Sequence, residues 1–210
     1  MRPITLALLL HVVLVACLLS ACEEDADTRT DARDYDETAL LAAREEKNNA
    51  FRTSSDSPIP ANKREQFPGL RFYEPSAEYF VHANVTWHTP PDTIIIGTTM
   101  GGDERRAVRA ASLSFQLNGA TSRLTGYRFI ETTTPYEGML FVPFRDGTNG
   151  FTTYEAGRYL DVPIGEGDAS AVIDFNTAYH PLCLFNHDYS CPLPPPENTL
   201  RYKIEAGEKR

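Results

Sequence analysis

Two stretches of polar residues near the ends of expected strands are the places in this sequence where side chains could meet and do chemistry. One stretch holds Arg158, Tyr159 and Asp161, and the next holds Asp174 and Asn176. Because side chains alternate along a strand, Tyr159 shares a face with Asp161 and not with Arg158. Asp174 and Asn176 share a face for the same reason. If the two strands are neighbours, Asp161 and Asp174 can form a carboxylate pair, in which repulsion raises one pKa and prepares that carboxyl group for acid/base catalysis.

The same residues also fit a structural role. Asp161 and Asp174 would then accept hydrogen bonds from backbone or Arg groups at the strand ends, and Asn176 would cap a turn. The sequence has no Ser-His-Asp, Walker, Rossmann or HExxH pattern, which favours a binding module over an enzyme, so we assign no catalytic residue. The two carboxylates are the candidates for a hydrolase. The candidates for ligand binding, together with an aromatic surface beside them, are Arg158, Tyr159, Asn176, Tyr154, Tyr136 and Phe151.

The four cysteines fall into two groups, Cys17 and Cys22 near the N-terminus and Cys183 and Cys191 far downstream. If export places the chain in an oxidising compartment, the second pair is expected to form a disulfide. Closing so short a loop stabilises the fold by roughly 2.5 kcal/mol. A metal site that adds His187 to this pair is the alternative, but it lacks a fourth ligand. We expect neither a metal nor another cofactor.

The first 22 residues indicate export and lipid attachment. Arg2 precedes an apolar run from Ile4 to Leu19, and Leu19-Ser-Ala-Cys22 matches the lipobox of a lipoprotein signal peptide. A second match ends at Cys17 and would leave apolar residues at the new terminus. An uncleaved anchor is disfavoured, because this run of 16 residues, which Thr5 and His11 interrupt, falls short of the ~20 that span a bilayer. We expect residues 1–21 to be removed and Cys22 to carry the lipid, palmitate included, which tethers the protein to a membrane of the bacterial cell envelope, facing the periplasm or the cell surface.

Acidic residues follow Cys22 directly. From Glu23 to Lys47 there are ten acidic and four basic residues, and such a stretch buries too little apolar surface to order itself. We expect residues 22–36 to be a disordered tether. Residues 51–210 hold 15 basic and 19 acidic residues, a near balance that offers no basic face for nucleic acid.

Residues 37–210 are expected to form a single β-rich domain. Helix formers from Glu37 to Arg52 predict one leading helix. Asn118-Gly119 predicts a tight hairpin turn, and Gly126 is the expected β-bulge in the return strand. About eight short strands with hairpin turns predict an antiparallel β-sandwich or a partly open barrel. The expected strands are 79–88, 93–98, 111–117, a return strand through 124–129, 139–144, 158–164, 171–175 and 200–205.

Several motifs in the downstream part of the chain carry a family resemblance. They are Phe67-Pro-Gly-Leu-Arg-Phe-Tyr, Leu140-Phe-Val-Pro-Phe-Arg-Asp-Gly-Thr-Asn-Gly, Gly157-Arg-Tyr-Leu-Asp161, Asp174-Phe-Asn-Thr-Ala-Tyr-His-Pro and Cys191-Pro-Leu-Pro-Pro-Pro-Glu-Asn198. Together they resemble the bacterial domain-of-unknown-function family 1684, some of whose members are lipoproteins, from about Lys47 to Gly207.

The resemblance implies a domain boundary but supplies no reaction. It departs at His180, where family members usually carry Asn, and His187 falls in a variable stretch, so neither histidine is implied as a site. Relatives without export signals keep similar cysteines, which adds reduced, buried thiols as an alternative for the downstream pair. The sequence therefore predicts a lipid-anchored extracytoplasmic domain that binds a small molecule or an envelope component, or that acts as an envelope-associated scaffold. A hydrolase-like enzyme that uses Asp161 and Asp174 is the alternative.

Overall fold

The computed structural model describes residues 34–130 and 138–210. The expected signal peptide, the lipidation site Cys22, the tether up to residue 33 and Tyr136 lie outside the described residues. No helix in the described part of the chain is long and apolar enough to cross a membrane.

Helix α1 spans Glu37–Thr53, which confirms the predicted leading helix. The side chain of Asp36 caps its N-terminus by accepting a hydrogen bond from the Ala39 N–H at 3.0 Å. One face of α1 is buried through Leu40, Arg44 and Phe51. Because an arginine lies among the apolar residues of this face, the helix must meet polar groups where it docks.

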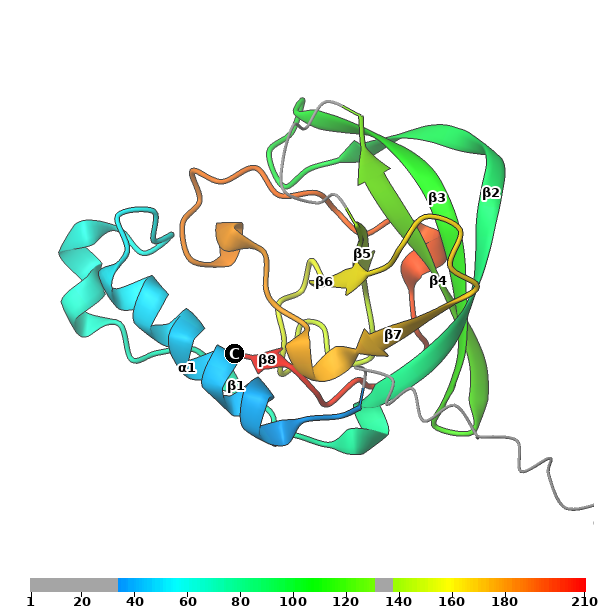
Figure 1. The fold of residues 1–210 in the computed structure, drawn as a ribbon. Coiled ribbons are helices and arrows are strands. Elements are labelled where there is room, and N and C mark those ends of the chain that lie inside the picture. The colour runs from blue at the N-terminus through cyan, green and yellow to red at the C-terminus, as the bar shows by residue number, and fades with distance from the viewer. Residues whose placement is uncertain (1–33, 131–137) are drawn as a thin grey trace, which may run out of the picture. The chain divides into compact units, whose positions relative to one another are not determined.

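Six antiparallel strands form a curved, nearly closed barrel, which is the partly open barrel predicted from the sequence (Figure 1). Their order across the sheet is β6-β5-β4-β3-β2-β7, and the two edge strands β6 and β7 lie beside each other. The bounds are β2 Phe80–Gly97, β3 Glu104–Leu117, β4 Ala120–Phe129, β5 Met139–Phe144, β6 Arg158–Pro163 and β7 Ser170–Asp174.

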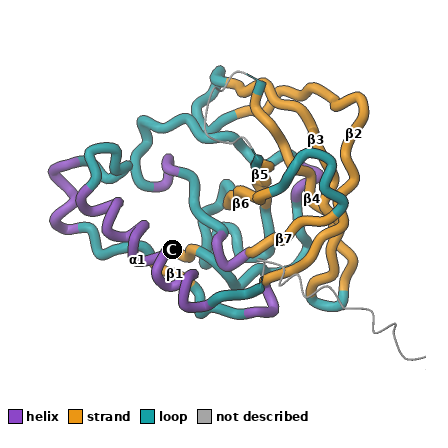
Figure 2. Tube along the Cα trace, viewed as in Figure 1, coloured by secondary structure: helices purple, strands orange, loops and turns teal. Residues whose placement is uncertain are grey.

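A second, two-stranded sheet pairs β1 (Arg71–Phe72) with β8 (Glu208–Lys209) on the side of the barrel where α1 lies. Figure 2 shows α1 on this side and the long strands β2, β3 and β4 on the opposite wall. The short 3-10 helices are η1 Ala61–Gln66, η2 Ala77–Tyr79, η3 Phe175–Thr177, η4 Leu182–Leu184 and η5 Pro196–Asn198.

The barrel interior is filled by apolar side chains that alternate along the strands. The ring of Phe175, which follows β7, packs against Phe115 of β3 at 5.7 Å and against Phe144 of β5 at 5.5 Å between ring centroids. Leu113 and Leu140 are fully buried in the same cluster. These contacts join strands that are far apart in the sheet order, so the closure of the barrel, and not only strand pairing, buries the core.

The predicted strands 79–88 and 93–98 are one long strand, β2, and the break between them is wrong. Pro90 and Pro91 lack backbone N–H groups and interrupt the pairing with β3. The register shifts between Trp87 and Asp92, and Asp92 then pairs with Arg109. The prolines therefore bend the strand without ending it.

The strand predicted at 200–205 is also wrong, because this segment is irregular and the carbonyl of Ile204 accepts a hydrogen bond from a side chain described below. The hairpin turn is confirmed, since Asn118 and Gly119 have φ values of 53° and 72°. The bulge expected at Gly126 lies in the partner strand, where Ala110 is the extra residue opposite it. Gly126 has a different role: a Cβ atom there would lie 2.7 Å from a methyl carbon of Leu140.

Candidate functional site

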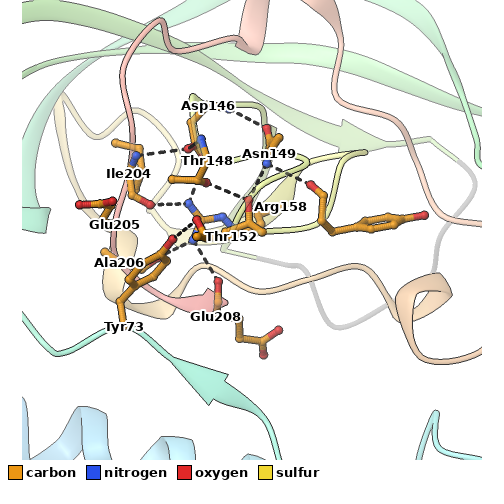
Figure 3. A network of polar contacts seen from close by, with 12 residues as sticks. Tyr73, Asp146, Thr148, Asn149, Thr152, Arg158, Ile204, Glu205, Ala206 and Glu208 are labelled. Carbon is orange, nitrogen blue, oxygen red and sulfur yellow. Dashed lines mark hydrogen bonds and ion pairs between the residues drawn. The ribbon is translucent and has the colours of Figure 1, made fainter. Parts of the chain in front are cut away.

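Arg158 is the centre of a buried polar network at the start of β6 (Figure 3). Its side chain is fully buried, and Nη2 lies 2.9 Å from Oδ2 of Asp146, with which it forms an ion pair. The same guanidinium donates hydrogen bonds to the backbone carbonyls of Ile204, Ala206 and Glu208. These bonds tie the C-terminal segment to β6. Although Arg158 is a predicted ligand-binding residue, both of its terminal nitrogens donate to groups of the protein itself and its side chain has no exposed surface.

Asp161 and Asp174 do not form the carboxylate pair on which the hydrolase alternative depends. Oδ2 of Asp161 accepts a hydrogen bond from the Tyr179 hydroxyl at 2.9 Å. Oδ1 of Asp174 accepts from the backbone N–H and the side-chain amide of Asn176, at 2.9 and 2.8 Å. Burial raises the pKa of both carboxyl groups, and neither raises the pKa of the other. The geometry therefore favours the role of Asp161 and Asp174 as hydrogen-bond acceptors over their role as a catalytic pair.

Asn176 and Arg44 hold the region where β7 ends. The Asn176 amide accepts from the Ser76 N–H at 3.0 Å and donates to the Ser76 carbonyl at 2.8 Å. Arg44, on α1, donates to the carbonyls of Asn176 and Tyr73 at 3.1 and 2.9 Å. The arginine on the buried face of α1 thus meets polar backbone groups, which is what its burial requires.

Cys183 and Cys191 are free thiols, so the predicted disulfide is not formed in this structure. The two residues are nevertheless neighbours, because the Cys183 N–H donates to Sγ of Cys191 at 3.2 Å. His187 does not complete a metal site with them, and the described part of the chain holds no group of three His, Cys, Asp or Glu side chains able to bind a metal ion.

The residues of the predicted aromatic surface differ in how far they are exposed to solvent. The Tyr159 hydroxyl donates to the Pro192 carbonyl and its ring packs on Tyr179, so Tyr159 is buried. Tyr154 is partly exposed, and Phe151 is 83% exposed. These residues do not form one continuous aromatic face.

A cavity of about 220 Å³ opens between the two-stranded sheet and the turn η4. Its apolar wall comes from Leu70, Leu184 and Phe185, and its polar wall comes from both strands of the small sheet. Sequence reasoning missed this place, because its residues come from three segments far apart in the chain. The lining residues are Gly69, Leu70, Arg71, His180, Leu184, Phe185, Glu208, Lys209 and Arg210.

The one carboxylate in this wall, Glu208, is already paired. Oε1 of Glu208 lies 2.7 Å from Nζ of Lys47 on α1, and Oε2 accepts from the His180 backbone N–H at 2.8 Å. Burial raises the pKa of Glu208, but the contacts with His180 and Lys47 outweigh burial and hold that pKa below its usual value. Glu208 is therefore ionised and its charge is balanced by Lys47.

His180 is neutral and hydrogen-bonded at both ring nitrogens. Burial lowers its pKa. Nδ1 lies 3.4 Å from Oε2 of Glu208, and Nε2 accepts from the Tyr154 N–H at 3.3 Å, which places the ring proton on Nδ1. An asparagine amide also offers one donor and one acceptor, so an asparagine at this position could serve the same two partners. His180 thus has a structural role in the wall of the cavity.

Three cations remain at the cavity. Arg71 is exposed and has no polar side-chain partner among the residues described. Nζ of Lys209 lies over the ring of Tyr73 at 5.4 Å, and Arg210 forms an ion pair with Glu155 at 3.1 Å. With Glu208 neutralised, this wall carries excess positive charge beside an apolar surface.

Comparisons with known proteins agree with the fold and name no activity. The family described as "Protein of unknown function (DUF1684)" matches residues 65–209. An uncharacterised protein of Haloarcula marismortui, solved by NMR in solution, is 38% identical with a TM-score of 0.64. The match covers 83% of this chain and 94% of that one. No curated protein matches the chain.

Proposed function

We propose, from the premise that this chain belongs to the DUF1684 family of proteins of unknown function, that it is a lipid-anchored extracytoplasmic domain that binds a small anion. The observation that carries the binding proposal is the cavity between β1, β8 and η4, where Arg71 and Lys209 stand beside Leu184 and Phe185. The lipid anchor is supported by the lipobox that ends at Cys22 and by the acidic residues that follow it.

The chemistry of the cavity favours a compact anion. An arginine guanidinium presents a planar fork of donors that matches a carboxylate or a phosphate, and Arg71 has these donors free of partners within the described residues. The volume of about 220 Å³ lies below the range of roughly 300–1,000 Å³ that is usual for drug-sized ligands. A ligand with one charged group and a short apolar part fits both walls.

Inorganic phosphate is the probe for the anion site, and the melting temperature of the full chain is the measurement. A ligand that binds only the folded state stabilises it by about 2.7 kcal/mol at a hundredfold excess over Kd. We expect a saturable rise in melting temperature with phosphate at constant ionic strength, and a loss of that rise in Arg71→Gln. Acetate tests in the same way whether a carboxylate suffices.

Arg123→Gln is the matched control. Arg123 is also an exposed arginine on a strand, but it does not line the cavity. The two variants lose the same charge, so non-specific screening affects both equally. Equal responses to phosphate in Arg71→Gln, Arg123→Gln and the unsubstituted chain would overturn the proposed site.

A further inference from the structure

Cys183 lies in the short 3-10 helix η4, and its neighbour Cys191 lies in the irregular segment that follows. Their exposed fractions are 4% and 5%. Besides the 3.2 Å contact between the Cys183 N–H and Sγ of Cys191, the segment is held through Thr99, which exchanges hydrogen bonds of 2.9 and 3.1 Å with the backbone of Cys191. Neither cysteine lies in a strand. Such a segment opens locally at less cost than a strand of the barrel, which gives a reagent access to the thiols.

The surroundings make the two sulfurs unequal. A hydrogen bond from Cys191 lowers the pKa of the Cys183 thiol to about 6 against the effect of burial, and the hydroxyls of Thr99 and Tyr154 act in the same direction. The same bond and burial raise the pKa of Cys191. Near neutral pH the first sulfur is therefore a thiolate and the second a thiol. The titratable groups packed around the pair are phenols, those of Tyr154, Tyr159, Tyr179 and Tyr189.

We propose that Cys183 and Cys191 are a thiol–disulfide exchange site whose substrate is an incoming disulfide. The Cys183 thiolate attacks one sulfur of that disulfide, forms a mixed disulfide and releases one thiolate. Cys191 loses its proton to the released thiolate and attacks the Cys183 sulfur. This second step forms the intramolecular bond and releases the second thiolate, so two thiols of the protein are oxidised while one disulfide is reduced to two thiols.

The bond would also reach the cavity wall. Cys183 directly precedes Leu184 and Phe185, and Tyr154, whose N–H binds His180, lies within 4.0 Å of the Cys183 sulfur through its hydroxyl. Oxidation therefore restrains one wall of the cavity. This consequence rests on the proposed anion site, whereas the exchange chemistry does not.

Peptide mapping of the full chain tests the exchange. The reduced protein is exposed to glutathione disulfide, quenched with N-ethylmaleimide and digested with trypsin. Both cysteines lie on one tryptic peptide, 159–201, because no Lys or Arg lies between Arg158 and Arg201, and Cys17 and Cys22 lie on another. We expect peptide 159–201 to become two hydrogen masses lighter and to carry no maleimide.

Two serine variants identify the attacking sulfur. Cys191→Ser keeps a hydroxyl donor toward Cys183 and should accumulate glutathione at Cys183, since no second thiol resolves the mixed disulfide. Cys183→Ser should acquire glutathione at Cys191 about tenfold more slowly, because that sulfur is protonated near neutral pH. The rate in Cys191→Ser should fall as pH is lowered through about 6.

Three outcomes would overturn the exchange site. The first is that both thiols of the unsubstituted chain are alkylated after exposure to glutathione disulfide, and the second is that they react only in urea. The third is that the two serine variants react at equal rates. A melting curve of each variant separates a change in reactivity from a loss of folding. None of these readouts depends on phosphate. A negative result for the exchange site therefore does not contradict the anion site, and a negative result with phosphate does not contradict the exchange site.

Discussion

The guanidinium of Arg158 and the carboxylate of Asp146 meet at 2.9 Å with neither side chain exposed to solvent. The other carboxylate oxygen, Oδ1, accepts from the backbone N–H groups of Thr148 and Ile204 at 2.7 and 3.2 Å. One ion pair therefore joins β6, the loop after β5 and the C-terminal segment. A buried pair of this kind is costly to break, because the remaining charge is left without a partner in a medium that solvates it poorly.

Removal of either charge should destabilise the fold strongly. We expect Asp146→Asn or Arg158→Met to lower the free energy of unfolding by about 3 to 5 kcal/mol, measured by urea denaturation. Arg128→Met is the control, because the Arg128 pair with Glu166 is at the surface and such pairs contribute about 0 to 1 kcal/mol. If Arg158→Met costs no more than Arg128→Met, the network does not stabilise the protein in the way proposed.

The two hydrogen bonds of the His180 ring predict which substitutions are tolerated. His180→Asn keeps one donor for Glu208 and one acceptor for the Tyr154 N–H, so its unfolding free energy should stay near that of the unsubstituted chain. His180→Leu leaves both partners unpaired in a buried place and should cost about 1 to 3 kcal/mol. Denaturant curves of the two variants show whether the hydrogen bonds of His180 or the packing of its ring stabilises the fold. Equal losses in both would show that ring packing matters more than the hydrogen bonds.

His180 should also make stability depend on pH. Burial lowers its pKa in the folded protein, so below the usual value of about 6.5 the unfolded chain binds more protons than the folded one. The contribution of neutral His180 is complete above that pH and is lost as the pH falls further. Unfolding free energies at pH 7.5 and 5.5 should differ more for the unsubstituted chain than for His180→Asn. An identical pH dependence in both would mean that folding does not lower the pKa of His180.

Gly126 should not tolerate even a methyl group. A Cβ atom there would lie 2.7 Å from Leu140, so Gly126→Ala should cost about 1 to 3 kcal/mol by overpacking. Gly101→Ala is the control, because a Cβ at Gly101 meets no atom within 4 Å. In the background Leu140→Ala, the loss of stability caused by Gly126→Ala should be smaller. Thermal unfolding of the unsubstituted chain, the two single variants and the double variant measures this coupling. Strict additivity would rule out the proposed contact.

The lipid anchor is tested at Cys22. Cys22→Ser removes the sulfur that would be acylated, so the protein should leave the membrane fraction or persist as a precursor of higher mass. Mass spectrometry of the unsubstituted protein should find diacylglycerol on a mature N-terminal Cys22. A mature N-terminus without this lipid would contradict the anchor.

Features with a local cause could be predicted from the amino-acid sequence. The helix formers of Glu37–Thr53 and the positive φ values of Asn118-Gly119 depend on neighbouring residues, so both elements were predictable. The alternation along the strands likewise indicated an antiparallel β-sandwich or a partly open barrel, because both have strands with one buried face.

Which distant segments meet depends on the three-dimensional fold. It carries β2 past Pro90 and Pro91, because pairing with β3 resumes beyond them. Asp161 and Asp174 face different partners in the closed barrel, although both lie at its edge strands. The cavity joins residues near 70, 180 and 209, and the charge of its Glu208 is balanced by Lys47 from α1. Such long-range contacts are set by how the barrel closes and where α1 and the C-terminal segment dock, and no local pattern encodes either.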